Sequence, residues 1–403
     1  MDLKSGYPWW AVKNGLMHAF PSLREDVRCD VAILGGGITG ALVADELARH
    51  GHDTVVVEQR DIAWGSTSAS TALLQYEIDT HMTELAQRYD EDAAVLAYRA
   101  CNDAIAMIAD VARRVGAVDF AAAHSLYYAS RRRDVRALRE EHALRAKHGL
   151  DVEWLDADAV RARYGFDAPC AILSRNAARV DPYRLANRLL IGLEKVGTRV
   201  FDRSPVDAIE LTPRGVRLRT ADGAAVHAKH LVMAAGYANQ TFLSQRVARN
   251  RSSYAFVTDP IDPAALGALR RTLVWESARP YLYVRPTADD RLLIGGEDDA
   301  VDIPARRDAA VDRKARTLAD KFARLFPELP LTPAFAWAGT FAETADGLPF
   351  FGAHPQHGAR VQFAMAYGGN GITYSMLGAG LLRAAIERRK HPLAALFGFD
   401  RVS

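Results

Sequence analysis

The stretch that decides the fold of this chain is Val31-Ala32-Ile33-Leu34-Gly35-Gly36-Gly37-Ile38-Thr39-Gly40. Its first four residues form the short apolar run that is typical of a buried parallel strand. Its last six fit the pattern G-x-G-x-x-G, whose glycines permit a tight turn, a close approach of the backbone to phosphate and close helix–strand packing. A helix over 38–50 and a β-branched strand over 54–58 would complete a βαβ unit.

The same unit predicts where a dinucleotide binds. Glu58 ends the second strand, and a carboxylate there accepts hydrogen bonds from ribose hydroxyls and repels a 2′-phosphate. The N–H groups and the dipole at the start of the helix favour phosphates. The motif by itself does not distinguish NAD from FAD. The residues expected to hold this part of the cofactor are Gly35, Gly37, Ile38, Thr39, Gly40, Glu58 and Gln59.

Length and composition set wider limits. A chain of 403 residues predicts two or three domains. Its 51 basic and 49 acidic residues leave a net charge of +2, which argues against a general nucleic-acid binder. Three widely spaced cysteines indicate free thiols rather than a disulfide framework. No export signal or membrane-spanning stretch is recognisable, so a soluble cytoplasmic protein is expected.

The remaining patterns alternate between helices and strands, which is typical of an α/β protein. Helices are expected over 82–116, 132–148, from Asp181-Pro182 onward, 307–325 and 372–389. Strands are expected over 125–130, in 199–232, over 254–258, 281–285 and 292–296, and near 349–351 and 361–366. The strand-rich middle suggests a second sheet that is inserted into the first domain.

Three further segments favour a flavin dinucleotide. A small, hydroxyl-rich loop over 65–72 offers donors with little bulk, and the strand 230–236 ends in Ala-Gly, where backbone can approach a cofactor. The segment 367–373 leads directly into the last helix, whose first N–H groups would favour negative charge on a flavin ring. The residues expected to contact the cofactor here are Gly65, Ser66, Thr67, Ser70, Thr71, Ala72, Ala235, Gly236, Gly369, Asn370, Gly371, Ile372 and Thr373.

With these segments, and with RVDPYRL at 179–185, YLYVRPTADDRLLIGG at 281–296 and TADGLPFFG at 344–352, the chain resembles the D-amino-acid oxidase superfamily of FAD-dependent oxidoreductases. This superfamily includes glycine and sarcosine oxidases and the DadA-type dehydrogenases. The SGYPWW arm and the GSTSAST loop look most like γ-glutamylputrescine oxidases.

The resemblance implies a Rossmann-like FAD-binding domain that is interleaved with an antiparallel-sheet substrate domain. The FAD-binding domain would comprise 1–80, 165–245 and 340–403, and the substrate domain 81–164 and 246–339. The backbone of Val206 would contact the adenine.

Two departures from the family pattern bear on the site. Gly339 stands where sarcosine oxidases carry a flavin-linking cysteine, so non-covalent FAD is predicted. Phe341 stands where many relatives carry an arginine that clamps a carboxylate. Arg285, Tyr283 and Tyr254 are therefore the candidates for substrate binding, although each has a structural alternative, which for Arg285 weighs as much as the functional role. Glu343 is a further candidate.

The expected reaction is oxidation of a C–N bond in an amine or amino acid. A hydride would pass to flavin N5, and water would hydrolyse the resulting imine. Oxygen, a quinone or a protein would accept the electrons. The alternatives are a hydroxy-acid or glycerol-phosphate dehydrogenase on the same fold, an FAD subunit of a larger oxidase or RNA-modification assembly, and a binding module for NAD. No nucleic-acid partner and no metal site is expected.

Overall fold

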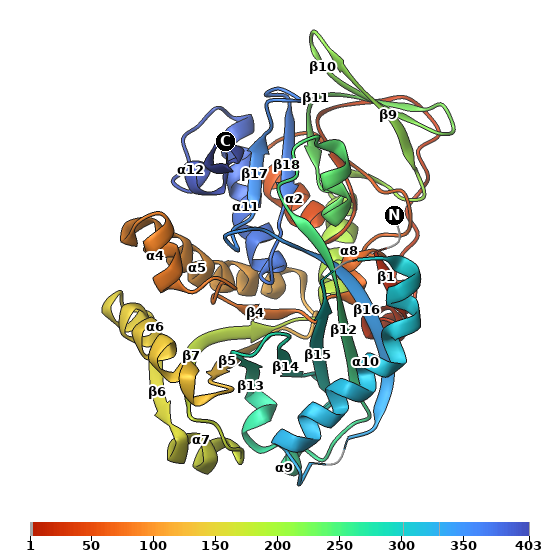
Figure 1. Ribbon diagram of the computed structural model, residues 1–403. Helices are drawn as coiled ribbons and strands as arrows, with labels where there is room; N and C mark the ends of the chain where they lie inside the picture. The colour runs from red at the N-terminus through yellow and green to blue at the C-terminus, as the bar shows by residue number, and fades with distance from the viewer. Residues whose placement is uncertain (1–2, 301, 330, 403) are drawn as a thin grey trace.

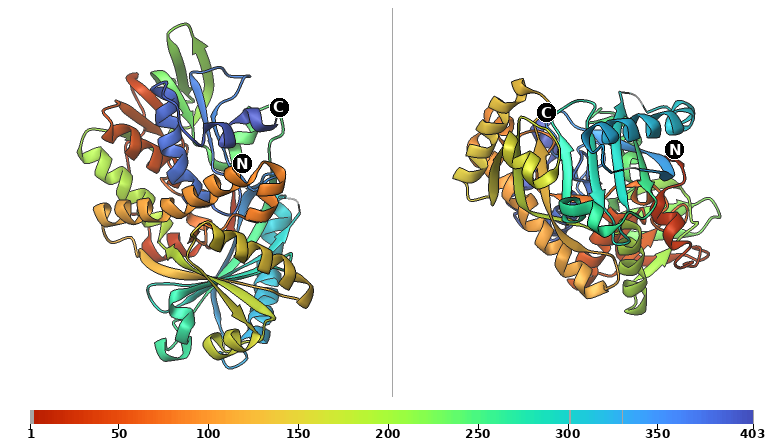
Figure 2. Two further views of the ribbon diagram at one scale, coloured as in Figure 1. Left: turned by 90° about the vertical axis from the view of Figure 1, so that its left-hand side faces the viewer. Right: turned by 90° about the horizontal axis from the view of Figure 1, so that it is seen from below.

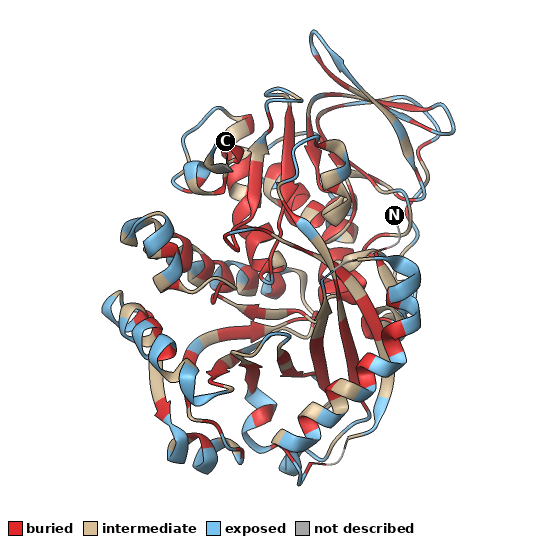
Figure 3. Ribbon diagram, in the orientation of Figure 1, coloured by how far each residue is buried: buried red, intermediate tan, exposed pale blue. Residues whose placement is uncertain are grey.

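Two β-sheets, of eight and ten strands, organise the computed structural model, which describes residues 3–300, 302–329 and 331–402. Figure 1 shows the eight-stranded sheet in the upper half of the molecule and the ten-stranded sheet in the lower half. Both sheets have buried central strands, whereas the outward sides of the surrounding helices are exposed (Figure 3). The α/β class predicted from the sequence is confirmed.

The eight-stranded sheet contains the predicted βαβ unit. Its strand order is β17-β18-β11-β2-β3-β8, and β18, β11, β2, β3 and β8 run parallel to one another. All four residues of β3 are buried, as expected of a central parallel strand. A hairpin of β9 and β10 extends from β11. The strands are β2 (Val27–Leu34), β3 (Thr54–Val57), β8 (Arg199–Phe201), β9 (Val206–Thr212), β10 (Gly215–Thr220), β11 (Ala225–Met233), β17 (Phe350–Ala353) and β18 (Val361–Met365).

Three helices form one packed layer beside this sheet. They are α2 (Ile38–Arg49), α8 (Pro182–Lys195) and α11 (Gly371–Ile386), and α2 packs against both of the others. Asp181 caps α8 by accepting a hydrogen bond from the Arg184 N–H at 2.9 Å, as the Asp-Pro signal predicted. Both α2 and α11 begin beside the same cavity, described below.

The ten-stranded sheet follows the order β1-β16-β12-β15-β14-β13-β5-β7-β4, with β6 also paired to β7. Its pairs are antiparallel except for β13 and β5, so the sheet is mixed rather than purely antiparallel. Helix α10 (Pro304–Leu325) lies across one face (Figure 2). The strands are β1 (Lys4–Gly6), β4 (Leu73–Gln75), β5 (Ala121–Tyr128), β6 (Val152–Asp156), β7 (Cys170–Arg179), β12 (Arg249–Thr258), β13 (Thr272–Glu276), β14 (Leu282–Pro286), β15 (Leu292–Asp299) and β16 (Pro333–Glu343).

Two local expectations need correction. The helical region over 82–116 is two helices, α4 (Met82–Arg88) and α5 (Glu91–Val115), because Asp90 accepts a hydrogen bond from the Ala93 N–H at 2.6 Å and starts a new helix. The loop over 65–72 contains a helical turn, α3 (Ser66–Ala69). The other helices are α1 (Trp9–Asn14), α6 (Val135–Lys147), α7 (Ala157–Tyr164), α9 (Pro263–Leu266) and α12 (Ala394–Phe397), with 3₁₀ turns at Arg132–Asp134, Gly236–Phe242, Gly267–Arg271 and Phe399–Val402.

The predicted domain boundaries do not follow the division of the strands between the two sheets. Strands β4 and β7 pair with each other inside the ten-stranded sheet, although the predicted boundaries assign both to the FAD-binding part. The boundaries at 80 and 165 therefore stay a prediction about folding units rather than a description of the sheets. Within the described residues, no helix is long and apolar enough to cross a membrane.

Candidate functional site

A cavity of about 470 Å³ is lined by residues of both sheets. One end lies at the turn between β2 and α2 and at the end of β3, and the lining continues through 65–75 to the start of α11. The other end is formed by β12, β14 and β16. Its volume is in the usual range for sites that enclose a cofactor or small ligand.

The glycine turn leaves room that a side chain would remove. A Cβ on Gly36 would collide with Ile62 and crowd Glu58, and one on Gly40 would collide with the carbonyl oxygen of Gly35. Gly35 itself has a φ of +118°, which favours glycine. The glycine-rich loop and the first helical turn of α2 are therefore held close together, as the G-x-G-x-x-G pattern predicts.

Helix α2 begins at the cavity with a positive dipole end. Its N-cap, Gly37, provides no side-chain hydrogen bond, and Gly37, Ile38 and Thr39 line the cavity. The Ile38 N–H donates to Thr67 Oγ1 at 3.0 Å, and the Thr39 and Ser375 hydroxyls are 2.8 Å apart, which connects α2 to α11. This end of the cavity favours an anionic group such as a phosphate.

Glu58 lies where a carboxylate that binds the ribose hydroxyls is expected. Its Oε2 accepts from the Gly36 N–H at 2.8 Å and its Oε1 from the Arg60 N–H at 3.0 Å. These bonds fix the orientation of the carboxylate, and each oxygen retains a lone pair for a hydroxyl donor. Burial raises the pKa of Glu58, although the two backbone hydrogen bonds oppose that effect.

Three buried polar atoms along the lining test whether a dinucleotide fits. Arg60 Nε, Ser66 Oγ and Gln75 Oε1 have no hydrogen-bond partner among the described residues, and all three residues line the cavity. Buried polar atoms in native proteins are normally paired with protein, water or ligand. A long ligand that offers several donors and acceptors, as a flavin dinucleotide does, fits this set.

The start of α11 forms another wall. Asn370, its N-cap, donates from Nδ2 to the Glu77 carbonyl at 2.8 Å and makes no capping bond to its own helix. Gly369, Asn370, Gly371 and Ile372 line the cavity, and the Gly369 N–H donates to Asp79 Oδ2 at 2.8 Å. The positive end of this helix therefore also points to the cavity.

Nearly all residues predicted to contact the cofactor line this one cavity. The exceptions are Gly40, which packs against the Gly35 carbonyl, and Thr373, whose buried hydroxyl lies 3.4 Å from the Gln75 carbonyl. The predicted residues that it brings together are Gly35, Gly37, Ile38, Thr39, Glu58, Gln59, Gly65, Ser66, Thr67, Ser70, Thr71, Ala72, Val206, Ala235, Gly236, Gly369, Asn370, Gly371 and Ile372.

Sequence reasoning missed several lining residues. Arg60 could have been found, since it directly follows the Glu58-Gln59 pair. Leu3, Trp275 and Trp337 come from distant segments and carry no local signal for a cofactor site. The described lining contains no cysteine and no histidine, and Gly339 lies beside Ala69.

The candidate substrate residues have different positions. Tyr283 lines the cavity and lies flat over Gly295, where any Cβ would collide with its ring. Tyr254 also lines it, but its hydroxyl donates to Asp299 Oδ2 at 2.6 Å. Trp275 stacks on Tyr127 with a centroid distance of 3.8 Å, so this end of the cavity is largely aromatic.

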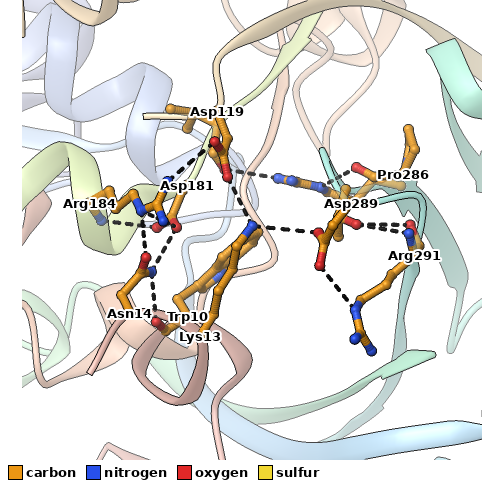
Figure 4. A network of polar contacts seen from close by, with 12 residues as sticks. Trp10, Lys13, Asn14, Asp119, Asp181, Arg184, Pro286, Asp289 and Arg291 are labelled. Carbon is orange, nitrogen blue, oxygen red and sulfur yellow. Dashed lines mark hydrogen bonds and ion pairs between the residues drawn. The ribbon is translucent and has the colours of Figure 1, made fainter. Parts of the chain in front are cut away.

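The structure does not place Arg285 in the cavity. Its guanidinium is 1% exposed and donates to the carbonyls of Thr71, Ala72 and Val180 at 2.9 to 3.1 Å and to that of Pro286. Figure 4 shows the ion-pair network beside Pro286, in which Lys13 lies between Asp119 and Asp289. These contacts support the structural alternative: Arg285 fixes the backbone of the cavity wall rather than a substrate.

The family of the chain follows from comparison with known proteins. Residues 30–385 match the family described as FAD dependent oxidoreductase. The chain therefore belongs to the DAO family of FAD-dependent oxidoreductases, and its cofactor is FAD.

Its particular relatives can be named. The chain is 28% identical over 396 residues to γ-glutamylputrescine oxidoreductase of Escherichia coli strain K12, covering 94% of this chain and 89% of that protein. It is 28% identical over 360 residues to glycine oxidase of Bacillus licheniformis, covering 86% and 89%. Its fold is similar to that of glycine oxidase from Geobacillus kaustophilus, with a TM-score of 0.77, 21% identity and coverage of 92% and 98%.

Proposed function

We propose that this enzyme oxidises a C–N bond of an amine or amino acid. The observation that supports this best is the continuity of one cavity, from the glycine turn and Glu58 to the aromatic end near Tyr283. FAD, when bound, supplies the hydride acceptor for this reaction. The names of two relatives, γ-glutamylputrescine oxidoreductase and glycine oxidase, describe oxidation of an amine and of an amino acid.

The protein would contribute binding and orientation. Gly35 to Thr39 and the start of α2 would hold the pyrophosphate, and Glu58 would hold the ribose. The start of α11, with Gly371 and Ile372, would stabilise negative charge on the reduced ring system. The aromatic end would exclude water from the substrate carbon. We also propose that the cofactor is held without a covalent bond.

The test begins with the visible spectrum of the purified protein. Flavin absorbance that is released by acid precipitation would support non-covalent FAD. Amines, amino acids, 2-hydroxy acids and glycerol phosphate are then added separately without oxygen, and bleaching of the flavin is followed. Bleaching by amines or amino acids supports the proposal. Bleaching only by the alcohols would replace it with the hydroxy-acid or glycerol-phosphate alternative.

A further inference from the structure

Two adjacent carboxylates at the end of β15 lie on opposite faces of the sheet. Asp299 faces α10, since it accepts from the Tyr254 hydroxyl at 2.6 Å and pairs with Lys314 Nζ at 2.9 Å. The pairing of β12 with β15 shifts register here, and Glu297 has a φ of +56°. Asp298 therefore lies on the other face, as Ser253 does. Ser253 lines the cavity, whereas Asp298 lies next to it and outside the lining itself.

Within the described part of the chain, Asp298 forms no ion pair. Its Oδ1 is buried and has no hydrogen-bond partner within the described residues. The neighbour that Asp298 contacts through a hydrogen bond is Ser253. By contrast, Asp299 is paired, and Glu343 pairs with Arg251. A buried carboxylate without a paired cation is costly unless a ligand completes it.

The surroundings of Asp298 suit a cation rather than an anion. Tyr281 and Tyr283 line the cavity with ring centroids 5.7 Å apart, and the negative faces of such rings attract cations. Asp79, also in the lining, adds negative charge. Burial, Asp79 and Glu343 raise the pKa of Asp298 to about 6, while Ser253 and Arg279 oppose the increase.

Arg279 carries a positive charge near Asp298. The guanidinium of Arg279 lies 4.5 Å from the centroid of the Tyr281 ring, on an exposed residue outside the cavity lining. The charge that most strongly raises its pKa is Asp79. Phe341, which is predicted to stand in place of the carboxylate-clamping arginine, lines the cavity, and Arg285 is turned away from it. Arg279 is thus the remaining candidate for a substrate carboxylate near this end.

We infer that Asp298 binds the ammonium group of the substrate and takes up the proton that this group must lose before the neighbouring carbon is oxidised, and that the substrate is an alkylamine without a carboxylate beside the reacting carbon. This inference rests on the proposed function and narrows its substrate class. Asp298 is then a specificity-determining residue. The aromatic rings of Tyr281 and Tyr283 would surround the same positive charge and its neighbouring methylene groups.

The experiment compares n-butylamine with D- and L-norvaline, which are butylamine with a carboxylate added at the reacting carbon. Anaerobic flavin reduction by the holoenzyme is measured over a range of concentrations at pH 8. The quantity compared is the rate constant of flavin reduction divided by the dissociation constant of the amine. We expect this ratio to be at least tenfold higher for butylamine than for either norvaline. The variant Asp298→Asn should weaken butylamine binding at least tenfold.

Asp299→Asn is the matched control, because it removes the same charge from the adjacent residue on the other face. It should change butylamine binding less than twofold. The variant Arg279→Gln should leave butylamine binding unchanged or improved. If norvaline is preferred and Arg279→Gln removes that preference, the inference is overturned while the proposed function stands.

The remaining outcomes are also decisive. If Asp298→Asn and Asp299→Asn bind butylamine equally well, Asp298 does not receive the ammonium group. If the protein contains flavin that none of the amines or amino acids reduces, the proposed function fails and the inference fails with it.

Discussion

At the scale of single residues, this molecule buries charges in two different ways. Arg145 lies completely buried on α6 with Glu141 at 2.8 Å and Glu77 at 3.8 Å, and both carboxylates are also completely buried. Among the residues that the structure describes, Asp298 instead forms no ion pair, and its Oδ1 has no hydrogen-bond partner. The first arrangement brings opposite charges together, and its removal should affect stability, although both Glu77 oxygens and both Arg145 Nη atoms have no hydrogen-bond partner among the described residues. The second is incomplete, as expected of a site that awaits a ligand.

The variant Arg145→Met should lower the free energy of unfolding by about 3–5 kcal/mol, because it leaves Glu141 and Glu77 buried without their cation. Urea denaturation measures the change. Burial opposes ionisation of Glu141, but Arg145 and His81 bring its pKa down to about 2. A carboxylate with a depressed pKa stabilises the fold above its unfolded pKa, so the difference between wild type and variant should shrink as the pH falls toward 2.

Arg136→Met is the control on the same helix. Arg136 is 90% exposed and pairs with Glu140, so its removal should cost less than about 1 kcal/mol. Equal losses for the two variants would contradict the role of the buried network.

Asp298→Asn should stabilise the FAD-free protein at pH 7.5 by about 1–3 kcal/mol, since a carboxyl whose pKa is about 6 when folded and about 4 when unfolded destabilises the fold in its ionised form. The folded chain retains the Asp298 proton to a higher pH than the unfolded chain does. The free energy of unfolding therefore falls as the pH rises from 4 to 6. Near pH 4 the advantage of the variant should disappear. Guanidinium denaturation at both pH values measures this, and a variant that is less stable at pH 7.5 would contradict it.

At the scale of elements, short backbone segments form much of the cavity wall. Adding or removing a single atom that contacts such a segment would shift it. The turn between β2 and α2 is one example, and the segment 65–72 is another. Trp10 on α1 donates to the Ser70 carbonyl at 2.7 Å, and Trp337 on β16 donates to the Ala69 carbonyl at 2.9 Å. The N-terminal arm therefore helps to support the wall of the cavity.

Gly36→Ala should lower FAD affinity at least tenfold while the chain still folds. The added Cβ collides with Ile62 and crowds Glu58, so either the turn or the carboxylate must move. Equilibrium dialysis of FAD and the far-UV spectrum measure affinity and folding. The control is Gly192→Ala on α8, where nothing lies within 4 Å, and it should leave the affinity unchanged.

Trp10→Phe should release FAD several-fold faster than the wild type. A smaller aromatic ring stays in place of the indole, but the hydrogen bond to the Ser70 carbonyl is lost, which costs about 1 kcal/mol and loosens the segment that lines the cavity. The measurement is the recovery of free-flavin fluorescence after dilution. Tyr7→Phe is the control, because Tyr7 is 73% exposed. An unchanged release rate for Trp10→Phe would show that the arm does not support the site.

The elements also show how far the sequence could predict the structure. The βαβ unit, Glu58 and most of the lining were predictable, because short-range patterns of glycine, charge and apolar residues determine them. The orientation of Arg285 was not predictable. It depends on the carbonyls of Thr71 and Val180, which only long-range strand pairing brings close to Arg285. The face on which Asp298 lies depends on a register shift between β12 and β15, for which the sequence carries no clear signal.

At the scale of the whole molecule, the chain passes repeatedly between the two sheets. The cavity is lined by the eight-stranded sheet near Leu34 and Val57 and by the ten-stranded sheet near Ala255 and Tyr283. FAD bound in this cavity would therefore contact both halves at once. We propose that the two sheets unfold together when the cofactor is present.

Removal of FAD should lower the stability of both sheets. A ligand at about a thousand times its dissociation constant contributes about 4 kcal/mol. Hydrogen exchange with and without FAD is the measurement, and protection of β3 and of β14 should fall together. Loss of protection in only one of these strands would contradict coupling of the two halves by the cofactor.

Two of the tryptophans already described have an optical consequence. Trp275 and Trp337 line the cavity, and oxidised flavin absorbs in the range in which tryptophan emits. Energy transfer over such short separations quenches fluorescence strongly. The native chain thus carries its own reporter of cofactor occupancy: its ultraviolet-excited emission should rise as FAD leaves, without any label.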